Sequence, residues 1–383
     1  MKLYDEGKLR LDDQVSDLLP HYNLKQQYPG RGPVTVRSLL THSSGLPRES
    51  AHPYWTGPDF PFPTREQIDN ALGTQETLYP ASTYFQYSNL GLTLLGEIVA
   101  EVSGMPYETY VTEEILKPLE IMDTRPEMPD DLYGKQLAVG YSALNREGKR
   151  QKVNLFQARG ITPAAGFSSN VEDLGRFASW QFRLRDTTVA EILKPSTLKY
   201  MQSVHWTDPD WKLTWGLGFV VRKGPDGNTW VGHGGSCPGY RSSFQLDLKN
   251  RRGYAVMINS SGTNPGKYIG GIHGILGKLK SSKAEEENKP AQADLKPYTG
   301  YYNSMPWSSE EYIGTWDGKL VMMGLPTDNP ARAMTFYKHV EGDTFRRVRD
   351  NGELGEALVF ERDENGTITR YQRHGNYTKK MKR

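Results

Sequence analysis

Apolar residues recur at helical spacing in the segment Thr83–Gly104. The positions that share one face of a 3.6-residue repeat are Leu90, Leu94, Leu95, Ile98, Val99 and Val102. This pattern predicts an amphipathic helix that ends at the glycine. Similar reasoning predicts a helix over Asn170–Phe182, with Asn170 as its N-cap, and a glycine-rich helix over Tyr268–Leu279.

Alternating apolar and polar residues predict two β-hairpins. Trp215–Val221 is expected to pair with Thr229–Gly232, and Ser242–Leu248 with Tyr254–Asn259, each across a turn that contains glycine. Because these strands follow one another and helices flank them, we expect an α/β protein of the α+β kind, with an antiparallel sheet flanked by helices.

The pattern changes after residue 279. The segment 280–290 is polar and charged, so burial cannot offset its ordering entropy, and it is predicted to be a linker. Beyond it only strands are indicated, separated by turn signals such as Asp317-Gly318 and Asn365-Gly366. The sequence therefore predicts a first domain over 1–279, a linker over 280–294 and a small all-β barrel over 295–383.

Composition excludes several classes of protein. Lys and Arg number 47 and Asp and Glu 45, a balance that argues against a nucleic-acid partner. No apolar run approaches the ~18 residues of a membrane span. The single cysteine, Cys237, excludes an internal disulfide, and the eight histidines lack metal-binding spacing. We therefore expect no transmembrane segment, no metal and no cofactor.

A first candidate site is Tyr87-Ser88-Asn89, directly before the predicted apolar face. The positive end of a helix dipole and neighbouring cations would favour the phenolate of Tyr87, whose ordinary pKa of ~10 is otherwise too high for a base. Asn89 offers an amide donor and an acceptor to a substrate. Alternatively the triplet is only a helix start, with Ser88 or Asn89 as the cap.

A second candidate is the run from His233 to Gly239, between the two hairpins. Gly234 and Gly235 would let a substrate approach a strand edge, and a backbone N–H such as that of Ser236 would bind a developing oxyanion. His233 would orient the substrate or share a proton network. Alternatively the run is a glycine-rich edge with a solvated histidine.

The run from Leu39 to Pro47 has a structural explanation. Gly45 suits the left-handed position after a helix, and Pro47 stops the helix from continuing. A catalytic His42 is the alternative.

These motifs together resemble the serine β-lactamase and penicillin-binding-protein-like hydrolases, in particular the class C β-lactamase-like branch that includes esterases and D-amino-acid peptidases. The shared runs, in the family's order, are LLTHSSGLP, YSN, PAAGFSSNVEDL and HGGSCPGY. The resemblance covers about residues 1–279, and the all-β part resembles the lipocalin-like domain often appended to such hydrolases.

The resemblance implies acyl-enzyme hydrolysis of an amide or ester in a peptide, a β-lactam or an acyl ester. Tyr87 would match the general base and Asn89 the contact to the substrate amide. His233, Gly234 and Gly235 would match the strand motif that is Lys-Thr-Gly in many relatives, and the Ser236 N–H would match one oxyanion donor.

The chain departs from this family in its nucleophile. The Ser-x-x-Lys helix should run into the segment that begins at Met1, so we expect it to lie upstream of a truncated chain. The one internal match, Ser196 to Lys199, is explained by Ser196 as an N-cap. Cys237 lies beside the expected oxyanion donor and is a candidate substitute for the serine nucleophile. A reactive thiol needs a lowered pKa and exposure, and the sequence indicates neither.

The expectation is therefore a serine hydrolase that has little or no activity in the form given. A non-catalytic binding protein that uses the same cleft is the alternative. An upstream export signal would make the protein periplasmic or secreted, and neither compartment nor oligomeric state follows from the sequence.

Overall fold

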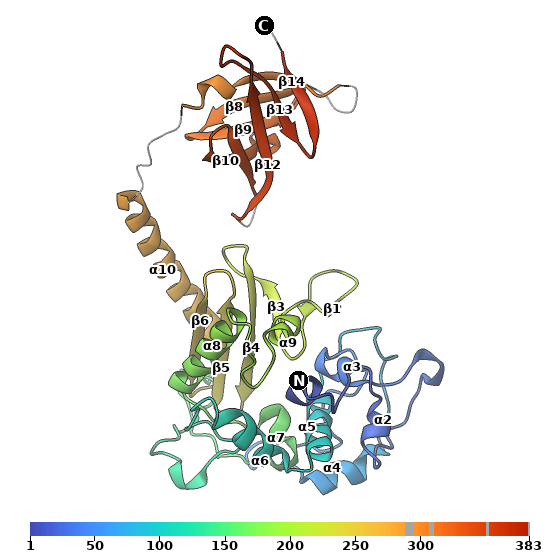
Figure 1. The fold of residues 1–383 in the computed structure, drawn as a ribbon. Coiled ribbons are helices and arrows are strands. Elements are labelled where there is room, and N and C mark those ends of the chain that lie inside the picture. Colours follow the sequence, from blue (N-terminus) through green and yellow to red (C-terminus); the bar gives the residue numbers. More distant parts are fainter. Residues whose placement is uncertain (288–293, 306–309, 350–351, 382–383) are drawn as a thin grey trace. The chain divides into compact units, whose positions relative to one another are not determined.

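A computed structural model describes residues 1–287, 294–305, 310–349 and 352–381 (Figure 1). Its contacts divide the chain into two compact units, Met1–Ile275 and Leu276–Arg383. Among the described residues, no helix has both the length and the apolar character that crossing a membrane requires.

Helices dominate the first two hundred residues. The α-helices are α1 (Lys2–Asp5), α2 (Val15–Leu18), α3 (Val36–Leu40), α4 (Arg65–Leu72), α5 (Asn89–Ser103), α6 (Tyr107–Val111), α7 (Thr162–Ala165), α8 (Val171–Arg185) and α9 (Pro195–Met201). Short turns of other helix types are η1 (Pro29–Arg31), η2 (Thr112–Leu116), η3 (Asp130–Leu132) and η4 (Arg159–Ile161). Helix α5 lies at the centre of the main core, because Leu90, Leu94 and Ile98 are fully buried there.

The start of α5 differs from the prediction. The helix begins at Asn89, not at Thr83, because Ser88 has an extended backbone and its hydroxyl accepts the Gly91 N–H at 2.8 Å. This is N-capping, and it fixes the direction from which the chain enters the helix. The predicted end is confirmed, since Gly104 lies in the left-handed region at φ +70°.

The sheet of the first unit is an antiparallel meander in the order β1-β2-β3-β4-β5-β6. Its strands are β1 (Trp206–Thr207), β2 (Thr214–Trp215), β3 (Val220–Lys223), β4 (Thr229–Cys237), β5 (Tyr240–Asp247) and β6 (Arg252–Ile258). The predicted β5–β6 hairpin is present, and β3 pairs with β4 as expected. The single strand predicted over Trp215–Val221 is wrong, because the chain turns at Gly218, φ +76°, and Trp215 belongs to β2, which pairs back onto β3 opposite Val220. The expectation that the His233–Gly239 run separates them is wrong, because β4 continues through Cys237 and pairs with β5 as far as Tyr240.

Helices cover both faces of this sheet. Alternate residues of a strand point to opposite faces. Val231 accordingly packs in one cluster with Phe182 of α8, and Trp230 in another with Ile269 of α10 (Pro265–Glu287). Helix α8 begins as predicted, with the Asn170 side chain accepting the Asp173 N–H at 2.8 Å. The α+β fold predicted for the first unit is confirmed.

The second unit contains a closed antiparallel barrel in the order β10-β11-β12-β13-β14-β7-β8-β9. Its elements are η5 (Lys296–Tyr298), β7 (Gly300–Asn303), β8 (Glu311–Trp316), β9 (Lys319–Gly324), α11 (Pro330–Ala333), β10 (Thr335–Glu341), β11 (Thr344–Val348), β12 (Leu354–Arg362), β13 (Ile368–Arg373) and β14 (Asn376–Lys380). Aromatic side chains such as Tyr302, Phe345 and Tyr371 fill its core, and the predicted all-β barrel is confirmed.

The predicted linker overlaps a helix. Helix α10 extends to Glu287, well past the Leu279 at which the sequence pattern ends it. Residues 288–293 of that linker lie outside the described residues.

Candidate active site

A cleft of about 1410 Å³ opens between the N-terminal end of α5 and strand β4. Tyr87 and Asn89 line it from the helix side, and His233 to Cys237 line it from the strand side. All six predicted site residues, Tyr87, Asn89, His233, Gly234, Gly235 and Ser236, therefore border one space. Residues 164–170, from the end of α7 to the residue before α8, contribute a further wall.

His42 anchors the segment that carries Tyr87. Its Nδ1 accepts the Ser88 N–H at 3.2 Å, and its ring stacks on Tyr87 with 4.1 Å between centroids. The Ser88 hydroxyl in turn donates to the Pro47 carbonyl at 2.7 Å. The two motifs that the sequence presents 40 residues apart are thus one structural unit.

The same contacts support the structural interpretation of His42. The side chain is 3 % exposed and does not line the cleft. Burial lowers its pKa to about 3, with smaller contributions from His233 and Arg48, so the imidazole is neutral near pH 7. Gly45 has the predicted left-handed backbone, at φ +74°.

Strand β4 presents an open edge to the cleft. Its pairing with β3 ends at Gly232, which is opposite Val220, whereas its pairing with β5 continues to Cys237. Within the described residues, no strand pairs with the β3-side edge from Gly234 to Ser236. Antiparallel strands direct alternate N–H groups to each side, so this edge offers unpaired backbone donors to a substrate.

The electrostatic environment of Tyr87 differs from the expectation. Burial raises the pKa of its phenol, and the nearby Glu49 carboxylate acts in the same direction. The Arg48 guanidinium, 4.9 Å from the ring centroid, lowers the pKa but does not outweigh burial. In this state the phenol therefore keeps its proton at neutral pH, and it can donate a hydrogen bond.

Glu49 is a cleft residue that the sequence motifs did not indicate. Asn89 Nδ2 donates to both Glu49 carboxylate oxygens, at 2.9 and 3.0 Å, and the Tyr54 hydroxyl donates to the same carboxylate. These bonds fix which way the Asn89 amide faces. Because both oxygens belong to one carboxylate, they share one N–H of the amide. The Asn89 carbonyl oxygen accepts no hydrogen bond from the described residues, so it can accept a substrate N–H.

His233 and Cys237 are in apolar surroundings. The His233 Nδ1 lies 2.7 Å from its neighbour's carbonyl at Gly234, and burial lowers the pKa of the ring. Burial also raises the pKa of the Cys237 thiol to about 11, and its Sγ lies 3.8 Å from the Ala165 carbonyl. A thiol with so high a pKa is a poor nucleophile.

The internal Ser-x-x-Lys match lies elsewhere. Ser196 and Lys199 are exposed on α9, and neither lines the cleft. Lys194 is the N-cap residue and Ser196 follows Pro195 inside the helix, so the predicted N-cap role of Ser196 is wrong. Among the described residues that line the cleft, the cations are Arg48 and Arg241 and none is a lysine.

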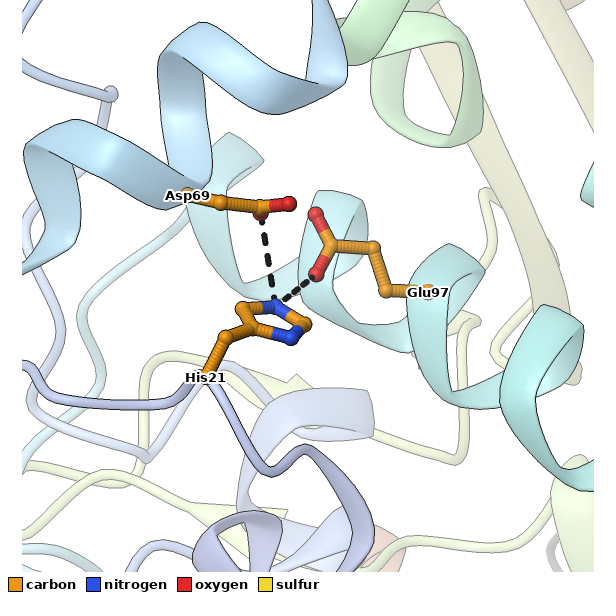
Figure 2. A group of neighbouring side chains, drawn as sticks. All are labelled: His21, Asp69 and Glu97. Atoms are coloured by element: carbon orange, nitrogen blue, oxygen red, sulfur yellow. Dashed lines mark hydrogen bonds and ion pairs between the residues drawn. The ribbon is translucent and has the colours of Figure 1, made fainter.

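One group of described side chains has the composition of a metal site. His21, Asp69 and Glu97 place their ligand atoms within 4.8 Å of one another, outside the cleft (Figure 2).

Comparison with known proteins agrees with this architecture. The family model described as Beta-lactamase matches residues 1–271. A D-alanyl-D-alanine-carboxypeptidase/endopeptidase, AmpH of Escherichia coli (strain K12), is 37% identical over 124 residues, which is 32% of each chain. Protein flp of Staphylococcus aureus (strain MW2) is 26% identical over 273 residues, or 68% of this chain and 49% of flp. The chain thus spans about a third to a half of the length of these relatives.

Solved structures resemble the chain over more of its length. The octameric penicillin-binding protein homologue from Pyrococcus abyssi aligns with a TM-score of 0.59 and 26% identity, covering 99% of this chain and 84% of that one. A D-stereospecific amidohydrolase from Streptomyces sp. aligns with a TM-score of 0.55 and 26% identity, covering 68% and 77%. The match of the family model to most of the chain shows that this protein belongs to the Beta-lactamase family of serine hydrolases.

Proposed function

We propose that the cleft binds an amide or ester carbonyl for acyl-enzyme hydrolysis, with the carbonyl oxygen at the open edge of β4. The observation that carries this proposal is that Tyr87, Asn89 and the unpaired segment Gly234–Ser236 line one space. Backbone N–H groups aimed at a developing oxyanion are usually the largest single contribution in such reactions. The Ser236 N–H takes that role.

Asn89, Tyr87 and His233 have separate roles in this proposal. Asn89 accepts the substrate N–H through its carbonyl oxygen, because Glu49 holds its amide group. Tyr87 exchanges a proton with the nucleophile and the leaving group. Since burial raises its pKa, it begins as a proton donor and becomes a base only when a cation close to it offsets that burial. His233, beside the same edge, orients the substrate.

A peptide with D-amino acids is the substrate class that we favour. The name of the E. coli relative states a D-alanyl-D-alanine carboxypeptidase and endopeptidase activity, and that of the Streptomyces protein a D-stereospecific amidohydrolase activity. The substrate of a carboxypeptidase ends in a carboxylate. Arg48 lines the cleft beside Tyr87 with an exposed side chain, although its Nε already forms an ion pair with Glu49 at 3.2 Å. An arginine suits the bidentate recognition of a carboxylate.

The nucleophile is a separate part of the proposal. Because the described cleft contains no Ser-x-x-Lys pair, we propose that the chain as given binds substrates but has little or no acyl-enzyme turnover. Loss of a serine nucleophile leaves only a residual rate, roughly 10³- to 10⁴-fold over water in serine proteases.

Covalent labelling tests both parts. The 383-residue chain is incubated with a fluorescent penicillin and with a fluorophosphonate, and the labelled site is found by peptide mass spectrometry. We expect no stoichiometric labelling. Labelling and turnover at a cleft serine, such as Ser236 or Ser242, would overturn the proposed absence of a nucleophile. A cleft that neither labels nor binds a D-alanyl-D-alanine peptide would overturn the proposed substrate site.

A further inference from the structure

Three segments far apart in the sequence bring an imidazole and two carboxylates together beside α5. His21 follows α2, Asp69 lies on α4, and Glu97 lies in the middle of α5 (Figure 2). The His21 Nε2 is 2.8 Å from Glu97 Oε2 and 3.3 Å from Asp69 Oδ1. None of the three lines the cleft, so the mechanism above does not use them.

The spacing of these atoms suits one divalent cation. Ligand bonds of about 2.1 Å place neighbouring donor atoms about 3.0 Å apart in an octahedron and about 3.4 Å apart in a tetrahedron. The two separations from His21 fall close to this range, and all three donor atoms lie within 4.8 Å of one another. Imidazole nitrogen with carboxylate oxygens is a donor set that zinc and neighbouring first-row metals accept.

Glu97 supplies a second, independent observation. Its side chain is 3 % exposed, and its Oε1 is buried without a hydrogen-bond partner in the described structure. Among the residues that the structure describes, this oxygen forms one ion pair, with Arg65 Nε at 3.9 Å. Figure 2 shows the carboxylate directed toward Asp69 and His21. Asp69 Oδ1 is likewise buried without a hydrogen bond.

A single proton on His21 cannot satisfy this arrangement. The Nε2–H would be shared between Glu97 Oε2 and Asp69 Oδ1, and Glu97 Oε1 would still lack a donor. A buried carboxylate without partners is destabilising unless a charge or a proton compensates it. A divalent cation accepts a lone pair from all three groups at once.

From this geometry we infer that His21, Asp69 and Glu97 form a structural site for a divalent first-row metal, with Zn²⁺ as the ion best suited to the donor set. The metal would join the segment after α2 and helix α4 to α5, the helix whose first residue is Asn89. Water would complete its coordination, since the chain supplies three donors.

Metal binding to the untagged 383-residue chain tests this site. After treatment with a chelator, isothermal titration with Zn²⁺ is expected to give one site per chain with a Kd of about 10 µM or tighter. Zn²⁺ at one hundred times the Kd is expected to raise the thermal midpoint by roughly 5 °C. Co²⁺ in place of Zn²⁺ is expected to give a visible ligand-field band, which reports the donor set directly.

Two matched variants assign the site. Glu97→Gln removes a donor oxygen while keeping the shape of the side chain, and is expected to weaken binding at least about 100-fold. Glu101→Gln, one turn further along α5 and exposed, makes the same charge change and is expected to leave the Kd unaltered. His21→Ala tests the third donor if the Glu97 variant folds poorly.

Three results would overturn the inference. One is the absence of a one-to-one site in the parent chain. Another is Zn²⁺ affinity that survives both Glu97→Gln and His21→Ala. The last is a thermal midpoint that Zn²⁺ leaves unchanged, because the three groups would then hold protons rather than a metal.

Discussion

Replacing His42 by asparagine should flatten the dependence of stability on pH. Asparagine adopts the left-handed backbone of this position, φ +54°, more readily than most residues, and its side-chain oxygen can accept the Ser88 N–H in place of Nδ1. The substitution also removes the imidazole, and the amide that replaces it does not titrate. The variant should lose about 1 to 3 kcal/mol at pH 7, mainly through the lost stacking on Tyr87.

The magnitude follows from the histidine's two states. The pKa of His42 falls from 6.5 to about 3 in the folded protein, so below pH 6.5 the unfolded chain binds a proton that the native protein does not. Stability therefore decreases as the pH falls through 6.5 and goes on decreasing down to about pH 3. Between pH 7 and pH 5 this one group should cost the parent chain about 2 kcal/mol.

Urea denaturation at pH 7 and pH 5, followed by tryptophan fluorescence, measures the difference. We expect the free energy of unfolding to fall by about 2 kcal/mol more in the parent than in His42→Asn, because other groups titrate alike in both. Equal losses in the two proteins would show that His42 can be protonated in the folded state. That result would refute the buried, neutral imidazole on which the anchoring of Tyr87 is argued.

Three further predictions concern the same region. Gly45→Ala places a Cβ against the Tyr79 carbonyl at φ +74°, and should lower the free energy of unfolding in urea by about 2 kcal/mol or more. The control Gly104→Ala, at φ +70° in open space, should lower it by about 1 kcal/mol. Equal losses in the two variants would refute the close approach at Gly45. Asn89→Asp sets a carboxylate against Glu49 and should lower the free energy of unfolding by about 3 kcal/mol at pH 7. Adding Glu49→Gln should recover part of that loss. Strict additivity in this double-mutant cycle would contradict the contact between the two side chains. Burial raises the pKa of Cys237 to about 11, so the thiol should react slowly with iodoacetamide. At pH 7.5 we expect alkylation, followed by mass spectrometry, to be at least about tenfold slower in the folded chain than in the urea-unfolded chain. Equal rates would contradict the burial of Cys237.

Local patterns in the sequence predicted the elements well. Helix α5, helix α8 with its Asn170 cap, and the β5–β6 hairpin each follow from periodicity and turn residues within about twenty positions. The strand predicted over Trp215–Val221 was missed as two strands, because the turn at Gly218 lies inside an apolar run. Strand β4 was predicted too short, because glycine lowers the strand signal over the His233–Gly239 run. Its pairing with β5 outweighs that local preference.

The cleft was predicted only where motifs mark it. Tyr87, Asn89 and the β4 run belong to recognisable motifs, whereas Glu49 has no motif and is tied to Asn89 only by the folded chain, 40 positions away. The direction of the Tyr87 pKa was missed because a sequence shows a neighbouring helix end but not the degree of burial. His21 and Glu97, 76 positions apart, have no metal-binding spacing, so the sequence led us to expect no metal.

Substrate binding by a pair of variants at one position tests the central claim most directly. Ser236→Pro removes the backbone N–H that we assign to the oxyanion, and Ser236→Ala keeps it. The parent chain and both variants are titrated with a D-alanyl-D-alanine peptide, after circular dichroism has shown that all three are folded. We expect equal Kd values for the parent and Ser236→Ala, and at least about tenfold weaker binding for Ser236→Pro. Equal affinity in all three proteins would contradict a substrate carbonyl bound at the β4 edge.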